Sequence, residues 1–111
     1  MERTAKAHWS GTIKEGRGEL TTQSEILNKT NYSFKTRLEE HQKGTNPEEL
    51  LAAAHSACFT MAVSFALTEK GLNPTSLDTE ATLTMEGLSI AGIHLSISGQ
   101  CPVLVQMNSK P

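Results

Sequence analysis

The stretch that decides the fold runs from Thr45 to Ala62 and reads TNPEELLAAAHSACFTMA. Asn46 is a good N-cap residue, and Pro47 suits the first helical position. Two glutamates follow in the first turn, where carboxylates are favoured by the positive end of the helix dipole. Gly71 offers a glycine just beyond the helix end. The stretch therefore begins a predicted helix of about 24 residues, or about 36 Å.

Small or apolar side chains occupy almost every face of this helix between residues 50 and 67. His55, Ser56 and Thr60 interrupt the apolar run, and acidic residues precede it. We therefore expect a central helix that is buried on most sides of a soluble protein, not a membrane span.

The flanking segments have the composition and alternation of β-strands. Four of them are residues 6–13, 18–22, 79–85 and 90–98. The first two predict a hairpin with a glycine turn, and the last two predict a hairpin that turns at Glu86-Gly87. Alternation over residues 32–37 predicts a half-buried strand with Arg37 pointing away from its aromatic face. The fold class is α+β, with antiparallel sheets around the buried helix, in a single domain over residues 1–111.

Composition limits the possible partners. The 111-residue chain has a formal net charge of −2 and a pI near 6.1, with scattered basic residues, so we expect no nucleic-acid partner. No apolar signal-peptide core follows Met1, so we expect a cytoplasmic location, where thiols stay reduced. A chain of this length buries only about 60 to 70% of its unfolded surface, so a second subunit is expected to complete the core.

Two cysteines occupy different settings. Cys58 lies in the middle of the predicted helix, three residues after His55 and on the same face. Cys101 directly precedes Pro102, at an expected helix start where the helix dipole favours a thiolate. A cysteine in a buried helix is often only a small apolar side chain. The second thiol and the nearby histidine make two-thiol redox chemistry the sharper hypothesis.

Two other uses of these residues remain open. His55, Cys58 and Cys101 could be the ligands of a catalytic zinc, although a structural zinc needs a fourth ligand that the neighbouring sequence lacks. Cys58 and His55 could serve a hydrolase, but no oxyanion donors are evident beside them.

Motifs along most of the chain resemble the OsmC and organic hydroperoxide resistance protein family. They are AHW (7–9), FKTR (34–37), GTNPEEL (44–50), AAHSACF (53–59), PTSLDT (74–79) and CPV (101–103). The resemblance implies an intertwined homodimer that acts as a thiol-dependent peroxidase in oxidative and osmotic stress. It implies that organic hydroperoxides and hydrogen peroxide are the substrates. It also implies an external dithiol reductant, such as a lipoylated or other thiol protein, and no haem, metal or flavin cofactor.

The resemblance also implies roles for four residues. Cys58 would be the peroxidatic thiolate that becomes a sulfenic acid, and Cys101 the resolving thiol that forms a disulfide with it. Arg37 would stabilise the thiolate and polarise the peroxide, and Glu48 would orient Arg37 through a charge-assisted pair. Glu48 precedes Cys58 by ten residues, or about 15 Å of straight helix, so its role requires a bent helix or a long reach by Arg37.

The resemblance is incomplete near Cys101. Members of the family carry a further helix before the CPV motif and a last strand after it, and neither is recognisable in this sequence. Cys101 would then be tethered differently, and a disulfide requires Cα atoms within about 7 Å. The alternative function is therefore a non-catalytic dimeric protein on the same scaffold, with a structural or small-ligand-binding role.

Overall fold

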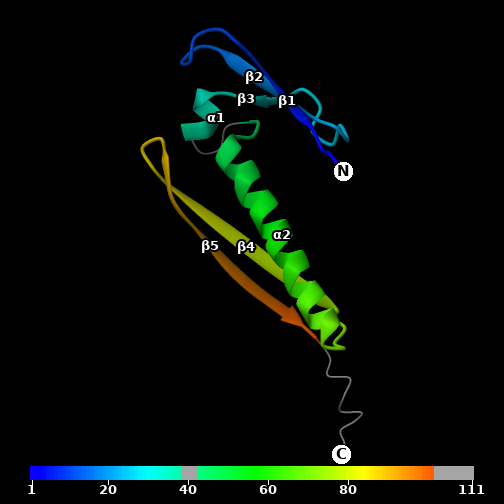
Figure 1. Cartoon of the computed structure of the whole chain (residues 1–111). Helices are drawn as coiled ribbons and strands as arrows, with labels where there is room; N and C mark the ends of the chain where they lie inside the picture. The colour runs from blue at the N-terminus through cyan, green and yellow to red at the C-terminus, as the bar shows by residue number, and fades with distance from the viewer. Residues whose placement is uncertain (39–42, 102–111) are drawn as a thin grey trace, which may run out of the picture. The chain divides into compact units, whose positions relative to one another are not determined.

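The computed structural model describes residues 1–38 and 43–101 (Figure 1). Its elements in chain order are β1 (Ala5–Ser10), β2 (Arg17–Thr22), β3 (Thr30–Tyr32), α1 (Phe34–Leu38), α2 (Pro47–Glu69), β4 (Ser76–Glu86) and β5 (Ser89–Gln100). The chain divides into two compact units, Met1–Leu50 and a second that begins at Leu51. The α+β class with antiparallel sheets and a long helix is confirmed.

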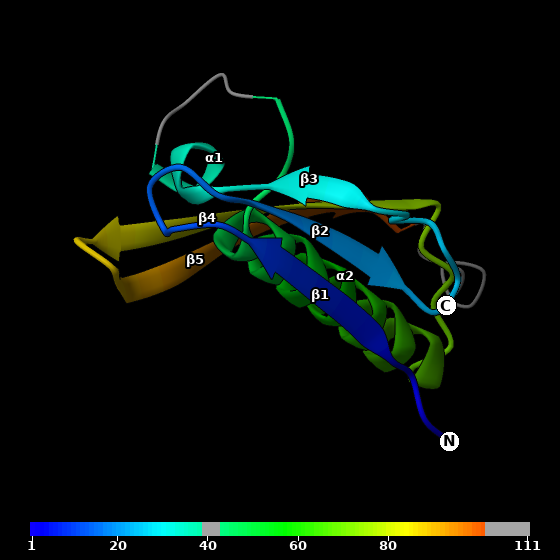
Figure 2. The same cartoon turned by 90° about the horizontal axis from the view of Figure 1, so that it is seen from above.

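The first unit contains a three-stranded antiparallel sheet in the order β1-β2-β3 (Figure 2). The predicted hairpin of β1 and β2 is confirmed, and Trp9 pairs with Gly18 across it. The Trp9 indole N–H donates a hydrogen bond of 2.9 Å to the carbonyl of Gly11, which has a φ of 100°. This bond ties the start of the loop after β1 to the Trp9 side chain.

The strand predicted over residues 32–37 is wrong, because β3 ends at Tyr32 and helix α1 begins at Phe34. Ser33 caps this helix: its hydroxyl accepts a hydrogen bond of 3.2 Å from the Thr36 N–H. The Ser33 N–H in turn donates to the Thr36 hydroxyl at 2.7 Å. This reciprocal pair satisfies helix-terminal groups, and it turns the chain where the alternating pattern predicted extension.

Helix α2 begins and ends where its caps predict. The side-chain oxygen of Asn46 accepts a hydrogen bond of 2.7 Å from the Glu49 N–H, which confirms Asn46 as the N-cap. At the other end Gly71 has a φ of 80°, and the Leu72 N–H donates to the Leu67 carbonyl at 3.0 Å. That bond closes a glycine C-cap.

In the second unit β4 and β5 form an antiparallel hairpin, with Glu86 opposite Ser89. Gly87 and Leu88 form the turn, and Gly87 has a φ of 64°. Along β5, Ile93, Leu95 and Ile97 are half-buried while the alternate residues are exposed. The predicted hairpin and its apolar face are both confirmed.

The expected burial of the long helix on most sides is wrong for the described chain taken alone. No residue of α2 is buried, and Met61 and Phe65 are 74% and 68% exposed. No hydrophobic side chain among residues 1–38 and 43–101 is fully buried. A two-stranded hairpin can cover only one side of a helix, so burial of the other sides requires additional protein segments. Within the same ranges, α2 alone is long and apolar enough to cross a membrane, as core helices of soluble proteins also can be.

Candidate active site

Arg37 and Glu48 form an ion pair inside the first unit. The Arg37 Nε donates to both carboxylate oxygens of Glu48, at 3.1 and 3.0 Å, and Nη2 lies 2.9 Å from Oε2. Arg37 comes from α1 and Glu48 from the first turn of α2. The side chains are only 32% and 12% exposed, so the pair is partly shielded from water. A charge-assisted pair of this geometry fixes the guanidinium plane.

Asn46 connects the start of α2 to α1, and Thr45 connects it to β3. The Asn46 amide donates a hydrogen bond of 3.0 Å to the carbonyl of Thr36 in α1, while its oxygen caps α2. The buried Thr45 donates from its hydroxyl to Glu49 at 3.0 Å, and its N–H donates to the carbonyl of Asn31 at 2.9 Å. The cap of α2 thus also ties α1 to α2, a function that the local cap signal does not indicate.

Arg37 also borders a small aromatic pocket that sequence reasoning missed. The pocket, called the aromatic pocket below, has a volume of about 140 Å³ and is lined by Trp9, Ile13, Tyr32, Ser33, Phe34, Arg37 and Pro47. The strand prediction had set Arg37 on the opposite face from the aromatic residues. The turn into α1 instead brings Arg37 to the same pocket as Tyr32 and Phe34. The Ser33 and Thr36 cap was the sequence signal for this turn.

Cys58 lies in the second unit, in an apolar groove of about 450 Å³ along α2. The groove is lined by Leu51, Ala54, His55, Cys58, Phe59 and Ala62. His55 and Cys58 therefore share one face, as predicted. Cys58 is exposed, and the expectation that it is buried is wrong because no residue of α2 is buried. Its thiol can be reached by a small molecule from the groove.

Cys101 directly follows β5 and is half-exposed, and both cysteines are free thiols. The carbonyl of the preceding Gln100 accepts bonds from the Thr75 N–H at 2.8 Å and from the Thr75 hydroxyl at 3.1 Å. These bonds fix the backbone of the residue directly before Cys101. The predicted helix start at Pro102 lies outside the described residues.

The sequence-predicted residues thus fall into two groups. Arg37 and Glu48 are in contact in the first unit, whereas Cys58 and Cys101 belong to the second unit. Over residues 1–38 and 43–101, no three His, Cys, Asp or Glu side chains gather as a metal site would require.

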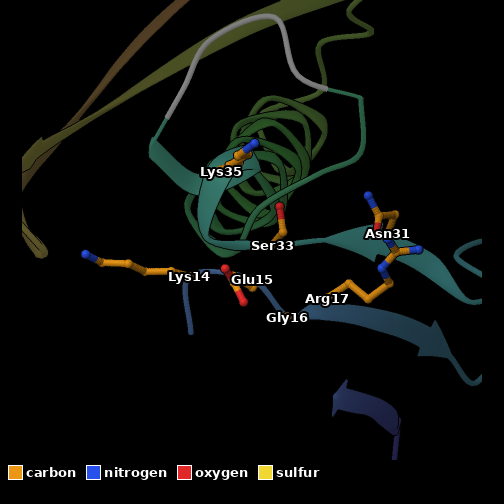
Figure 3. A pocket seen from close by; sticks show the side chains of 7 residues that line it. All are labelled: Lys14, Glu15, Gly16, Arg17, Asn31, Ser33 and Lys35. Atoms are coloured by element: carbon orange, nitrogen blue, oxygen red, sulfur yellow. The ribbon is translucent and has the colours of Figure 1, made fainter. Parts of the chain in front are cut away.

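A second hollow in the first unit, of about 590 Å³, is polar (Figure 3). It is lined by Lys14, Glu15, Gly16, Arg17, Asn31, Ser33 and Lys35. Figure 3 shows the Arg17 and Asn31 side chains close together and Lys14 extending away from them. It contains no thiol, so peroxide chemistry has no nucleophile there.

Residues 40–109 match the family described as OsmC-like protein. The peroxiredoxin OsmC proteins of Escherichia coli (strain K12) and Shigella flexneri are each 50% identical to the chain over 99 residues, which is 86% of this chain and 68% of theirs. The chain thus spans about two thirds of the length of these relatives.

Two solved structures share the fold. An organic hydroperoxide resistance protein OsmC from Legionella pneumophila is 24% identical with a TM-score of 0.61, covering 87% of this chain and 66% of that one. The organic hydroperoxide resistance protein OhrB of Bacillus subtilis is 24% identical with a TM-score of 0.56, covering 86% and 71%. With a family match over most of its residues and half of the aligned positions identical to the curated relatives, the chain belongs to the OsmC-like protein family.

Proposed function

We propose that the chain is a thiol-dependent peroxidase that reduces organic hydroperoxides, with Cys58 as the attacking thiol. The names of the relatives, peroxiredoxin OsmC and organic hydroperoxide resistance protein, support a peroxidase role in hydroperoxide resistance. The observation that carries the proposal is the shielded ion pair of Arg37 and Glu48. A peroxidatic thiol needs a fixed cation nearby, and this pair provides one in the first unit.

The first chemical step uses Cys58 and Arg37. The Cys58 thiolate attacks one peroxide oxygen, a sulfur–oxygen bond forms, and the oxygen–oxygen bond breaks. The second oxygen leaves with the electron pair and takes a proton, so the products are an alcohol and the sulfenic acid of Cys58. Glu48 occupies Nε and Nη2 of Arg37. The Nη1 donors are then the ones directed at the charge that develops on the peroxide.

The second step uses Cys101. Its thiol condenses with the sulfenic acid, which releases water and leaves a disulfide between Cys58 and Cys101. An external dithiol, such as a lipoylated or other thiol protein, then reduces the disulfide by thiol exchange and is itself oxidised. No step requires a metal or an organic cofactor.

We place this chemistry in a cytoplasmic homodimer of intertwined subunits. The exposed apolar side chains of α2, Met61 and Phe65 among them, support a second copy as the cover for this helix. An apolar helix covered in this way is a core helix and not a membrane span. The dimer also provides a second set of Arg37 and Glu48 side chains for the two thiols.

Intact-mass spectrometry tests the peroxidase proposal. The reduced protein is treated with one equivalent of cumene hydroperoxide, and its cysteine peptides are mapped. A loss of about 2 Da with Cys58 joined to Cys101 is the expected result. A gain of one oxygen at Cys58 without a disulfide keeps Cys58 as the peroxidatic thiol and removes Cys101 from its role. An unchanged mass overturns the proposal and favours the non-catalytic binding scaffold, and Cys58→Ser is the control that must not react.

A further inference from the structure

The aromatic pocket beside Arg37 is built with a defined shape. Trp9 from β1 and Tyr32 from β3 contact each other across the middle strand, with ring centroids 5.6 Å apart and planes tilted by 53°. Their rings lie over Gly18, where an added Cβ would collide with the Tyr32 ring and approach Trp9 to 2.8 Å. The absence of a side chain at Gly18 lets both rings come close to the backbone of β2.

The remaining walls come from three other segments. The indole N–H of Trp9 is bonded to Gly11, so the polar atom of that ring is already satisfied. Phe34 comes from the capped helix α1, and Pro47 comes from the first turn of α2. Ile13, which is 60% exposed, lines the pocket from the loop after β1. These walls are apolar, and Ser33, the cap of α1, adds one hydroxyl to the lining.

Arg37 is the charged group that borders this pocket. Glu48 binds the Nε and Nη2 atoms on one edge of the Arg37 guanidinium. The Nη1 atom lies on another edge, which does not take part in this ion pair. A ligand with an apolar body and a peroxide end matches this arrangement. Its body would lie among the rings while its oxygens meet the guanidinium.

We propose that the aromatic pocket binds the organic group of the hydroperoxide and favours compact, ring-bearing hydroperoxides over smaller ones. The inference rests on the proposed peroxidase function. A volume of about 140 Å³ suits a single aromatic ring, since an apolar cavity of about 150 Å³ is known to hold benzene. The ring pair of Trp9 and Tyr32 offers edge-to-face contacts to such a ring.

Trp9 is the single tryptophan of the chain, so its fluorescence reports on the pocket without any peroxidase turnover. The full-length protein is titrated with 2-phenyl-2-propanol, the alcohol formed from cumene hydroperoxide, and separately with tert-butanol. The expected result is a saturable fluorescence change with the ring-bearing alcohol at concentrations where tert-butanol gives none. An equal response to both alcohols, or no response to either, overturns the inference.

Substrate selectivity provides the second test. Ile13→Phe fills the pocket from an exposed loop position, and Ile26→Phe makes the same change at a residue that is 84% exposed and outside the pocket. We expect Ile13→Phe to lower the kcat/KM for cumene hydroperoxide relative to that for hydrogen peroxide about tenfold. Ile26→Phe should keep the wild-type ratio. An unchanged ratio in Ile13→Phe overturns the pocket assignment, whereas a wild-type protein that consumes no hydroperoxide overturns the peroxidase function itself.

Discussion

The guanidinium of Arg37 contacts both carboxylate oxygens of Glu48 at 2.9 to 3.1 Å. The two residues are eleven positions apart in the sequence. The pair joins the short helix α1 to the first turn of α2. Its rigidity depends on the planar fork of arginine, because lysine offers a single point charge and cannot reproduce the two-oxygen contact. The two-point contact therefore leads to a prediction about catalysis.

Replacing Arg37 by lysine keeps the charge and removes the fork. We expect Arg37→Lys to slow the oxidation of Cys58 by cumene hydroperoxide about a hundredfold, which is the usual cost of one lost catalytic donor. Glu48→Gln should slow it less, because the guanidinium remains and only its orientation is loosened. The rate is measured under single-turnover conditions as loss of free thiol. Lys35→Ala, on the same helix and exposed, is the control, and a wild-type rate in Arg37→Lys would remove Arg37 from the mechanism.

The caps of α2 were predictable from the residues themselves, whereas the contact of Arg37 with Glu48 was suggested only by the resemblance to the family. The helix caps act on backbone groups within a few residues of Asn46, Pro47 and Gly71. Their effects are local, so they can be predicted from the sequence. The ion pair depends on how α1 meets α2, and the resemblance to the family suggested it where spacing alone could not. The alternation over residues 32–37 misled because five or six residues cannot separate a short helix from a strand.

The exposure of α2 has a different physical origin. An apolar helix sequence indicates that the helix is buried in the native protein, but it does not indicate whether the same chain or another chain buries it. Within one chain the half-buried face of the β4 and β5 hairpin is small. For this reason the prediction that α2 is buried is wrong for the single chain. We now expect α2 to be buried in the dimer.

Asn46 should matter for stability beyond its role as a cap, because it both caps α2 and donates to the carbonyl of Thr36. We expect Asn46→Ala to lower the free energy of unfolding by about 2 kcal/mol, the upper end for a lost N-cap. Urea denaturation at fixed protein concentration measures the change. Asn28→Ala, in the exposed loop before β3, should change the free energy by less than about 0.5 kcal/mol. Equal effects of the two substitutions would refute the double role of Asn46.

The exposed face of α2 should drive subunit association. Phe65 is 68% exposed on this helix, and a charge at a buried aromatic position of an interface weakens binding by more than about 2 kcal/mol. We expect Phe65→Glu to shift the protein from dimer to monomer by at least thirtyfold in dissociation constant, as measured by light scattering coupled to gel filtration. Leu88→Glu, in the turn after β4 and 60% exposed, is the matched control. A dimer that persists in Phe65→Glu would place the interface elsewhere.

Gly18 and Gly92 are strand glycines that should respond oppositely to the same substitution. A Cβ at Gly18 meets the Tyr32 ring and lies 2.8 Å from Trp9, whereas a Cβ at Gly92 has no neighbour within 4 Å. Gly18→Ala forces the two rings off the sheet, and overpacking of this kind costs about 1 to 3 kcal/mol. Gly92→Ala removes freedom from the unfolded chain and should be neutral or stabilising by up to about 1 kcal/mol. Thermal unfolding followed by circular dichroism measures both, and near-ultraviolet spectra of Gly18→Ala should also lose the signal of the packed Trp9. Equal stability of the two variants would show that the rings do not lie on Gly18, and the walls of the aromatic pocket would need another support.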